Sequence, residues 1–239
     1  MAIKLVSLSE LSLTHDLISM SRFAVGLGPL SKNAGGTRDN CQVTVASNER
    51  RLIAFPIFLL IVSAIGMLAA FSLTLEKIHV LQDPNATASC DFSILVQCGK
   101  NLRSWQGSLL GFPNALLGLM GWPVVAATGA VMLAQGRMSR WFWRSFVSVA
   151  LAGFAFVIWL FIESVYSLST LCPWCMVTWV ATISLFVVTA AWTMKHGVWG
   201  ERSSTIGTKL LAWSPTIILG ILLIEAIIAQ LRLDVINHL

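Results

Sequence analysis

The hydrophobic positions of the chain gather into five long runs that show no in–out alternation along their length. A helix needs about 20 apolar residues to cross the hydrocarbon core of a bilayer, and runs of this kind recur at that length. The missing alternation argues against the strands of a membrane β-barrel. The pattern therefore predicts an all-α integral membrane protein with five transmembrane helices, at Leu52–Leu75, Ala115–Gly136, Ser145–Tyr166, Cys172–Met194 and Leu210–Leu231.

The composition supports the same class. Of 239 residues, 56% are hydrophobic and 11% are charged, which leaves too few polar side chains to cover a soluble domain of this size. No motif repeats at a fixed period, so we expect a single helical bundle. We predict a flexible cytoplasmic tail at residues 1–51, a membrane domain at 52–231 with a long outer loop at 76–114, and a short outer tail at 232–239.

The basic residues predict the orientation of the chain. Lys and Arg beside membrane spans are enriched on the cytoplasmic side. Twelve of the sixteen lie before the first span or in the loops after the second and fourth spans, and the other four are Lys77, Lys100, Arg103 and Arg232. The N-terminus is therefore expected inside a plasma or inner membrane and the C-terminus outside. The net charge of +5 is explained by this asymmetry and needs no nucleic acid.

Four of the five cysteines fall on the predicted outer face. Cys90 and Cys98 lie on the long loop, whereas Cys172 and Cys175 form a Cys-Pro-Trp-Cys unit at the start of the fourth span. Disulfides form and persist on an oxidising face of this kind. Cys41 lies in the predicted cytoplasmic tail and is expected to be a spare reduced cysteine.

Three chemistries are open to four such thiols. Two inert disulfides would fit, although a Cys-x-x-Cys ring is too small to constrain an unfolded chain much. A closed zinc site would also fit four thiolates, but the two pairs are unevenly spaced and no histidine lies near them in sequence. A redox relay uses more of the features, because a helix N-terminus favours the thiolate and Pro173 suits the first turn. A relay that ends in the membrane needs a lipid-soluble electron acceptor, and a quinone is the obvious one.

The segment "CDFSILVQCGKNLRSWQGSLLGFPNALLGL" at 90–119, followed by "LCPWC" at 171–175, resembles the vitamin K epoxide reductase family in its bacterial form. The resemblance covers about 52–231. It implies a four-helix catalytic core around a quinone pocket with one extra helix, and a membrane oxidoreductase that forms disulfides. No thioredoxin-like domain follows the fifth predicted span, so the redox partner is expected to be a separate DsbA-like thioredoxin-fold protein. The quinone, menaquinone or ubiquinone, would accept the electrons.

The resemblance also implies roles for single residues. Cys175 would pass electrons to the quinone, Cys172 would exchange with the loop, and Cys98 and Cys90 would carry electrons from the partner. Ser104 and Asn114 match positions close to the quinone head group. Trp179 stands where some family members have a Tyr, which changes the polar contact at that side of the pocket.

Other features receive plainer interpretations. Asp91 could shape the reactivity of its neighbour Cys90, but the plainer expectation is that it solvates the loop. The segment "GKNLRSWQGSLLGF" is amphipathic enough to form a half-helix over the bundle. Two alternative functions stay open at this point: reduction of a quinone or quinone epoxide for its own sake, and a non-catalytic membrane protein stapled by disulfides.

Overall fold

The structure is a computed structural model that describes residues 38–83 and 87–234, and the side chains of 38–52 are not part of the description. Residues 1–37 of the predicted N-terminal tail and 235–239 of the predicted outer tail therefore lie outside it. The described chain is helical, with the elements α2 (Arg38–Gln82), α3 (Gly99–Arg103), η2 (Gln106–Ser108), α4 (Ala115–Leu133), α5 (Arg140–Glu163), η3 (Ser164–Leu168), α6 (Pro173–Lys195) and α7 (Arg202–Leu233).

Five of the described helices are long and apolar enough to cross a membrane. The spans are Ile53–Gln82, Ala115–Leu133, Arg140–Leu168, Pro173–Lys195 and Arg202–Leu233. The prediction of an all-α membrane protein with five spans is confirmed. The short elements α3 and η2 lie in the long connection between the first two spans, where the sequence predicts a half-helix.

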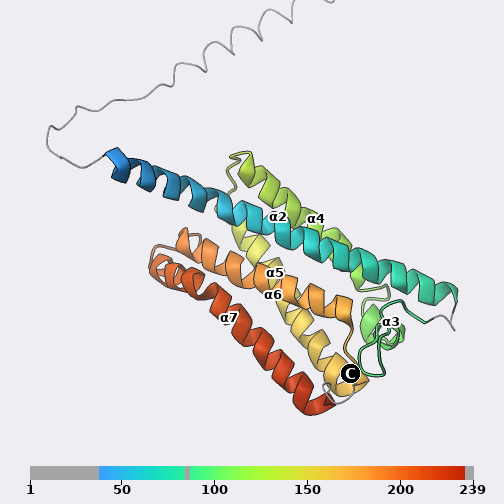
Figure 1. Cartoon of the computed structure of the whole chain (residues 1–239). Helices are drawn as coiled ribbons and strands as arrows, with labels where there is room; N and C mark the ends of the chain where they lie inside the picture. Colours follow the sequence, from blue (N-terminus) through green and yellow to red (C-terminus); the bar gives the residue numbers. More distant parts are fainter. Residues whose placement is uncertain (1–37, 84–86, 235–239) are drawn as a thin grey trace, which may run out of the picture. The chain divides into compact units, whose positions relative to one another are not determined.

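The described residues from position 46 onward, which are 46–83 and 87–234, form one compact unit. Figure 1 shows its long helices as coiled ribbons, with α6 and α7 joined as a hairpin. Aromatic rings from three helices pack at the end of the bundle formed by the last turns of α6. The ring centroids of Phe55 in α2 and Trp192 in α6 lie 4.4 Å apart, and Trp143 of α5 lies 4.8 Å from Trp192.

Small residues set the distance between α2 and α4. The Cα of Gly66 faces the indole of the buried Trp122, and a Cβ built on Gly118 would lie 2.8 Å from the Cβ of Ala70. Helices in a bilayer gain little from apolar burial against each other, because lipid tails are equally apolar. Close contact between small and large residues is therefore the main attraction available to this helix pair.

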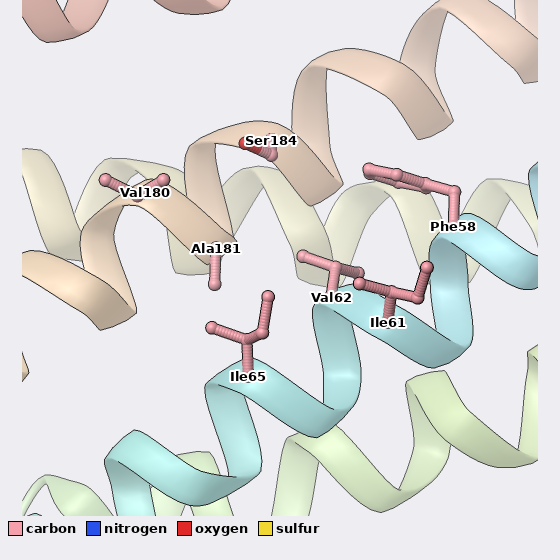
Figure 2. A pocket seen from close by; sticks show the side chains of 7 residues that line it. All are labelled: Phe58, Ile61, Val62, Ile65, Val180, Ala181 and Ser184. Carbon is pink, nitrogen blue, oxygen red and sulfur yellow. The ribbon is translucent and has the colours of Figure 1, made fainter.

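An apolar cavity of about 170 Å³ lies between α2 and α6. Figure 2 shows the side chains that line it, which are Phe58, Ile61, Val62 and Ile65 of α2 and Val180, Ala181 and Ser184 of α6. None of the predicted site residues is among them. Ser184 follows Cys175 by nine positions, which at 3.6 residues per turn puts the two residues on opposite faces of α6. This cavity therefore lies away from the thiol face of the helix.

The connection between α5 and α6 delivers Cys172 to its place. The chain leaves α5 through the π-helical turn η3 and then passes Ser169, which adopts a left-handed conformation with φ of 52°. The hydroxyl of Ser164 donates to the carbonyl oxygen of Thr170 across this turn. The reversal brings Leu171 and Cys172 back against the loop between α2 and α4.

Candidate functional site

Cys90, Cys98, Cys172 and Cys175 are present in two different states. Cys90 and Cys98 are joined by a disulfide with their Cα atoms 5.7 Å apart, whereas Cys172 and Cys175 are free thiols. An arrangement of two inert disulfides would leave no free thiol in this group. The structure instead combines one bonded pair with one reduced pair, which is what an exchange relay contains between two transfers.

The two pairs meet at one sulfur–sulfur contact. The Sγ atom of Cys172 lies 3.3 Å from the Sγ atom of Cys98, and both side chains are fully buried. Cys172 is the N-cap of α6, and its sulfur accepts a hydrogen bond of 3.4 Å from the backbone N–H of Cys175. A sulfur at this position is held by the helix terminus and is directed at the loop disulfide.

A short backbone pairing fixes the register of this contact. The N–H of Gln97 donates to the carbonyl of Leu171 over 3.0 Å, and the N–H of Leu171 donates to the carbonyl of Leu95 over 2.7 Å. Val96 and Leu171 form an isolated parallel bridge. Because the segments run in the same direction, the residues that follow the bridge, Cys98 and Cys172, are brought side by side.

The carboxylate of Asp91 holds the two loop cysteines together. It accepts hydrogen bonds from the backbone N–H groups of Cys98 at 2.7 Å, Gly99 at 2.9 Å and Ala88 at 3.2 Å. The sequence interpretation of Asp91 as a solvating residue is wrong, because the carboxylate faces the first N–H groups of α3. Only the position of Asp91, directly after one cysteine and seven residues before the other, could have indicated this.

The end of α2 also holds the loop. Lys77 is buried and its Nζ donates to the carbonyl oxygen of Leu102, one of the last carbonyls of α3. Glu76 accepts from the N–H and the hydroxyl of Ser89, the residue before Cys90. Sequence reasoning missed both residues, since it ended the first span at Leu75 and assigned the charges that follow to the outer loop.

A comparison with models of known families finds one match, to "VKOR: Vitamin K epoxide reductase family", over residues 57–190. This is more than half of the chain and contains the four cysteines of the two pairs. The chain belongs to the vitamin K epoxide reductase family. None of the curated proteins compared with the chain matches it. Vitamin K epoxide reductase proteins are membrane oxidoreductases associated with quinones and thioredoxin-like partners, and the resemblance read from the sequence is confirmed.

Cys175, which the family resemblance places at the quinone, lies between two apolar clusters. It packs against the cluster that contains Cys98, Leu102 and Cys172, and also against the cluster that contains Trp179. An apolar environment of this kind suits the ring of a quinone, and the side chain of Cys175 is partly exposed beside it. The surroundings of Cys175 therefore fit a quinone at the point where electrons would pass from the sulfurs to it.

The three predicted quinone-binding residues differ in their surroundings. Asn114 donates through Nδ2 to the carbonyl of Gln106 at 2.6 Å and accepts from the N–H of Leu109 at 3.1 Å. One hydrogen of its amide is left without a described partner. Ala115, the next residue, packs against the cysteine cluster, so Asn114 lies at the edge of the cysteine site.

Ser104 and Trp179 are committed to packing and local bonds. The hydroxyl of Ser104 donates to the carbonyl of Asn101 at 2.7 Å and accepts from the N–H of Gly107 at 3.2 Å. Trp179 is buried and meets the ring of Phe161 edge-on at 5.5 Å. The described contacts bring Trp179 next to Cys175 but connect Ser104 only to the turn between α3 and η2. Their quinone contacts stay predictions.

Polar contacts also join the short helices to the α5–α6 connection. Nε2 of Gln106 donates to Glu163 at 3.1 Å, and the hydroxyl of Ser164 lies 3.5 Å from Oδ1 of Asn101. A buried polar group is usually paired, yet Nδ2 of Asn101 and Oε1 of Gln106 are buried without a partner among the described residues. The segment that contains α3 and η2, called the covering segment below, is thus bonded to the end of α5 and the start of η3 by side chains that sequence reasoning did not single out.

Proposed function

We propose that this member of the vitamin K epoxide reductase family generates disulfide bonds by oxidising a separate thioredoxin-fold dithiol protein on the outer face of a bacterial plasma membrane. The electrons pass from the partner to Cys90 and Cys98, then to Cys172 and Cys175, and finally to a membrane quinone. The observation that carries the proposal is the 3.3 Å contact between the sulfurs of Cys98 and Cys172. It brings the loop between α2 and α4 against the N-terminus of α6.

Each transfer exchanges one disulfide for another. A thiolate of the partner bonds to Cys90, the Cys90–Cys98 bond breaks and Cys98 leaves with the electron pair. The partner's second thiol then displaces Cys90, which completes the partner's disulfide. Cys98 next attacks Cys172 of an oxidised inner pair, and Cys175 leaves as a thiolate.

The attack of Cys90 on Cys98 restores the loop disulfide and releases Cys172. The inner pair is then reduced and the loop pair oxidised, the same combination of states that the described cysteines have. A quinone supplies an acceptor for two electrons and two protons. Cys172 and Cys175 lose two electrons and two protons to it as their own disulfide forms.

The residues around Cys175 support the last transfer. The free amide hydrogen of Asn114 would donate to a quinone carbonyl and stabilise the negative charge that develops there. Trp179 would form one apolar wall beside Cys175. Ser104 would contact the quinone head group from the covering segment, and this segment would exclude water from the thiols.

The test follows quinone absorbance with purified protein. With a reduced DsbA-like protein or with dithiothreitol, the wild-type protein should reduce a quinone, and Cys172→Ala or Cys175→Ala should abolish the reduction with both. Both sulfurs are needed because the inner disulfide is the product of the last step. Full activity in either variant, or turnover only in the direction of thiol formation, would rule out the proposal.

A further inference from the structure

The loop that carries Cys90 presents two large apolar side chains to the outside. Phe92 is 72% exposed and Ile94 is 87% exposed. Both residues lie outside the membrane-spanning segments, so the hydrocarbon core of the bilayer does not account for their exposure. Apolar side chains gathered on a surface outside the membrane mark contact sites for other molecules.

This exposure is fixed by the local structure of the loop. The N–H groups of Phe92 and Ser93 donate to the carbonyl of Val96 at 2.9 and 3.0 Å, and the N–H of Val96 donates back to the hydroxyl of Ser93 at 3.1 Å. Leu95 turns inward and packs against a core cluster. The turn therefore holds Ile94 at its tip and directs it outward.

A second cavity, of about 360 Å³, adjoins this turn. It is lined by Ser89, Cys90 and Phe92 of the loop and by Pro173, Trp174 and Val177 of α6. Cys98 and Cys172 do not line it and are fully buried. Cys90 is therefore the residue of the loop disulfide that borders this cavity.

We propose that Phe92 and Ile94 form the docking surface for the dithiol protein, and that its attacking cysteine enters the cavity at Cys90. The inference rests on the proposed function and adds the surface by which the partner is recognised. Cys90 itself is 3% exposed, so a folded protein must cover the turn closely to bring a sulfur to it. The partner that fits is a thioredoxin-fold protein whose reactive cysteine is surrounded by apolar side chains.

The bond exchange at this surface is balanced within the complex. The partner's thiolate forms a bond to Sγ of Cys90 as the Cys90–Cys98 bond breaks. Cys98 leaves with the electron pair beside Cys172, and the second thiol of the partner later displaces Cys90 and gives up its proton. The partner is oxidised by two electrons and the loop pair is reduced by two.

The test compares two reductants on single variants of the full chain in detergent micelles. In Ile94→Ser and Phe92→Ser, the KM for a reduced DsbA-like protein should rise about tenfold. Burying one large apolar side chain in an interface strengthens binding by about tenfold or more. The kcat should be unchanged, and so should the rate with dithiothreitol, which needs no docking surface. Ile94→Val should restore the wild-type KM.

The matched control is Trp141→Ser. Trp141 is 75% exposed and lies in the first turn of α5, at the end opposite to η3 and the cysteines. Its KM for the protein dithiol should equal that of the wild type. An equal rise in this variant would overturn the proposal, since general loss of apolar surface would then explain the effect.

Three other results would also overturn it. An unchanged KM in both loop variants would show that the turn is not contacted. Equal loss with both reductants would show that the turn supports the disulfide instead of docking. A change in lipid vesicles that is absent in micelles would show that Phe92 and Ile94 contact the membrane.

A measurement without quinone separates this inference from the proposed function. In Cys98→Ser, the free thiol of Cys90 should attack the disulfide of an oxidised DsbA-like protein and hold it as a mixed disulfide, as the partner's other cysteine leaves as a thiolate. Ile94→Ser should slow this step about tenfold. If the wild-type protein reduces no quinone with either reductant, the proposed function fails. The rate of adduct formation still decides the docking surface, because an unchanged rate contradicts it.

Discussion

Asp91 determines the geometry of the loop disulfide at the scale of single residues. Its carboxylate is bonded to the backbone of both Ala88 and Cys98, which lie on the two sides of the disulfide. The ring closed by Cys90 and Cys98 is thus held by a second, non-covalent connection. Hydrogen bonds to a charged group are worth about 1.5 to 3 kcal/mol each, so this connection is a substantial one.

We expect Asp91→Asn to make the loop disulfide easier to reduce, and Asp91→Ala more so. Asn keeps one acceptor oxygen but loses the charge, whereas Ala loses all the bonds. The equilibrium constant for reduction by dithiothreitol should rise about tenfold in Asp91→Asn, since one charged hydrogen bond is worth about one factor of ten. The measurement uses a Cys172→Ser, Cys175→Ser background, and an identical constant in all three proteins would refute the role of Asp91.

The sequence identifies the residues that carry the chemistry better than those that position them. The cysteines are recognised by type and spacing, and the family match contains them all. Asp91, Lys77 and Gln106 act through contacts with backbone or side chains distant in sequence. Spacing alone does not contain such contacts, so only the folded chain reveals them.

Helix packing decides stability at the scale of the elements. A Cβ on Gly66 would overlap the indole ring of Trp122, which is buried between α2 and α4. A bulky side chain in a close-packed contact cannot give way without moving a helix. Close packing of α2 against α4 therefore requires a residue without a Cβ at position 66.

Gly66→Ala should lower the thermal unfolding midpoint of the protein in detergent, with a loss of about 1 to 3 kcal/mol from overpacking. Gly121→Ala is the control, since a Cβ there would meet no atom within 4 Å. Its midpoint should stay equal or rise slightly, because Ala favours a helix over Gly. Equal midpoints for the wild-type protein and Gly66→Ala would contradict this description of the α2–α4 contact.

The elements show why spans are predicted well and their ends less so. The apolar runs are continuous, and a bilayer permits only helices there, so all five spans are found. The first span continues from the predicted Leu75 to Gln82 because Glu76 and Lys77 have partners on the loop. A charged residue ends a hydrophobic run in the sequence, but it does not end a helix whose charges are satisfied.

The whole molecule is proposed to transfer electrons from a dithiol protein to a membrane quinone through two cysteine pairs with different functions. Cys90 and Cys98 lie on a loop, and Cys172 and Cys175 lie at the N-terminus of α6. The Cys90→Ala, Cys98→Ala variant should keep quinone reduction with dithiothreitol and lose it with the DsbA-like protein. A small reductant reaches the inner pair directly, whereas a bulky protein needs the loop pair.

The comparison consists of two rate constants for each protein. Cys41→Ser is the control, as its cysteine is expected on the opposite membrane face, and both rates should match the wild type. Equal loss with both reductants in the loop variant would mean that the loop pair builds the quinone pocket and does not relay. Loss of turnover in the control would mean that the proposed orientation is wrong.

The proposed relay depends above all on one contact between the loop and the bundle. The sulfurs of Cys98 and Cys172 lie 3.3 Å apart there. The most direct test removes their partners in a Cys41→Ser, Cys90→Ala, Cys175→Ala protein, oxidises it mildly and digests it. Mass spectrometry should find the peptides of Cys98 and Cys172 joined by a reducible disulfide in most molecules. Two separately alkylated cysteines, or a bond between two copies of the chain, would contradict the relay.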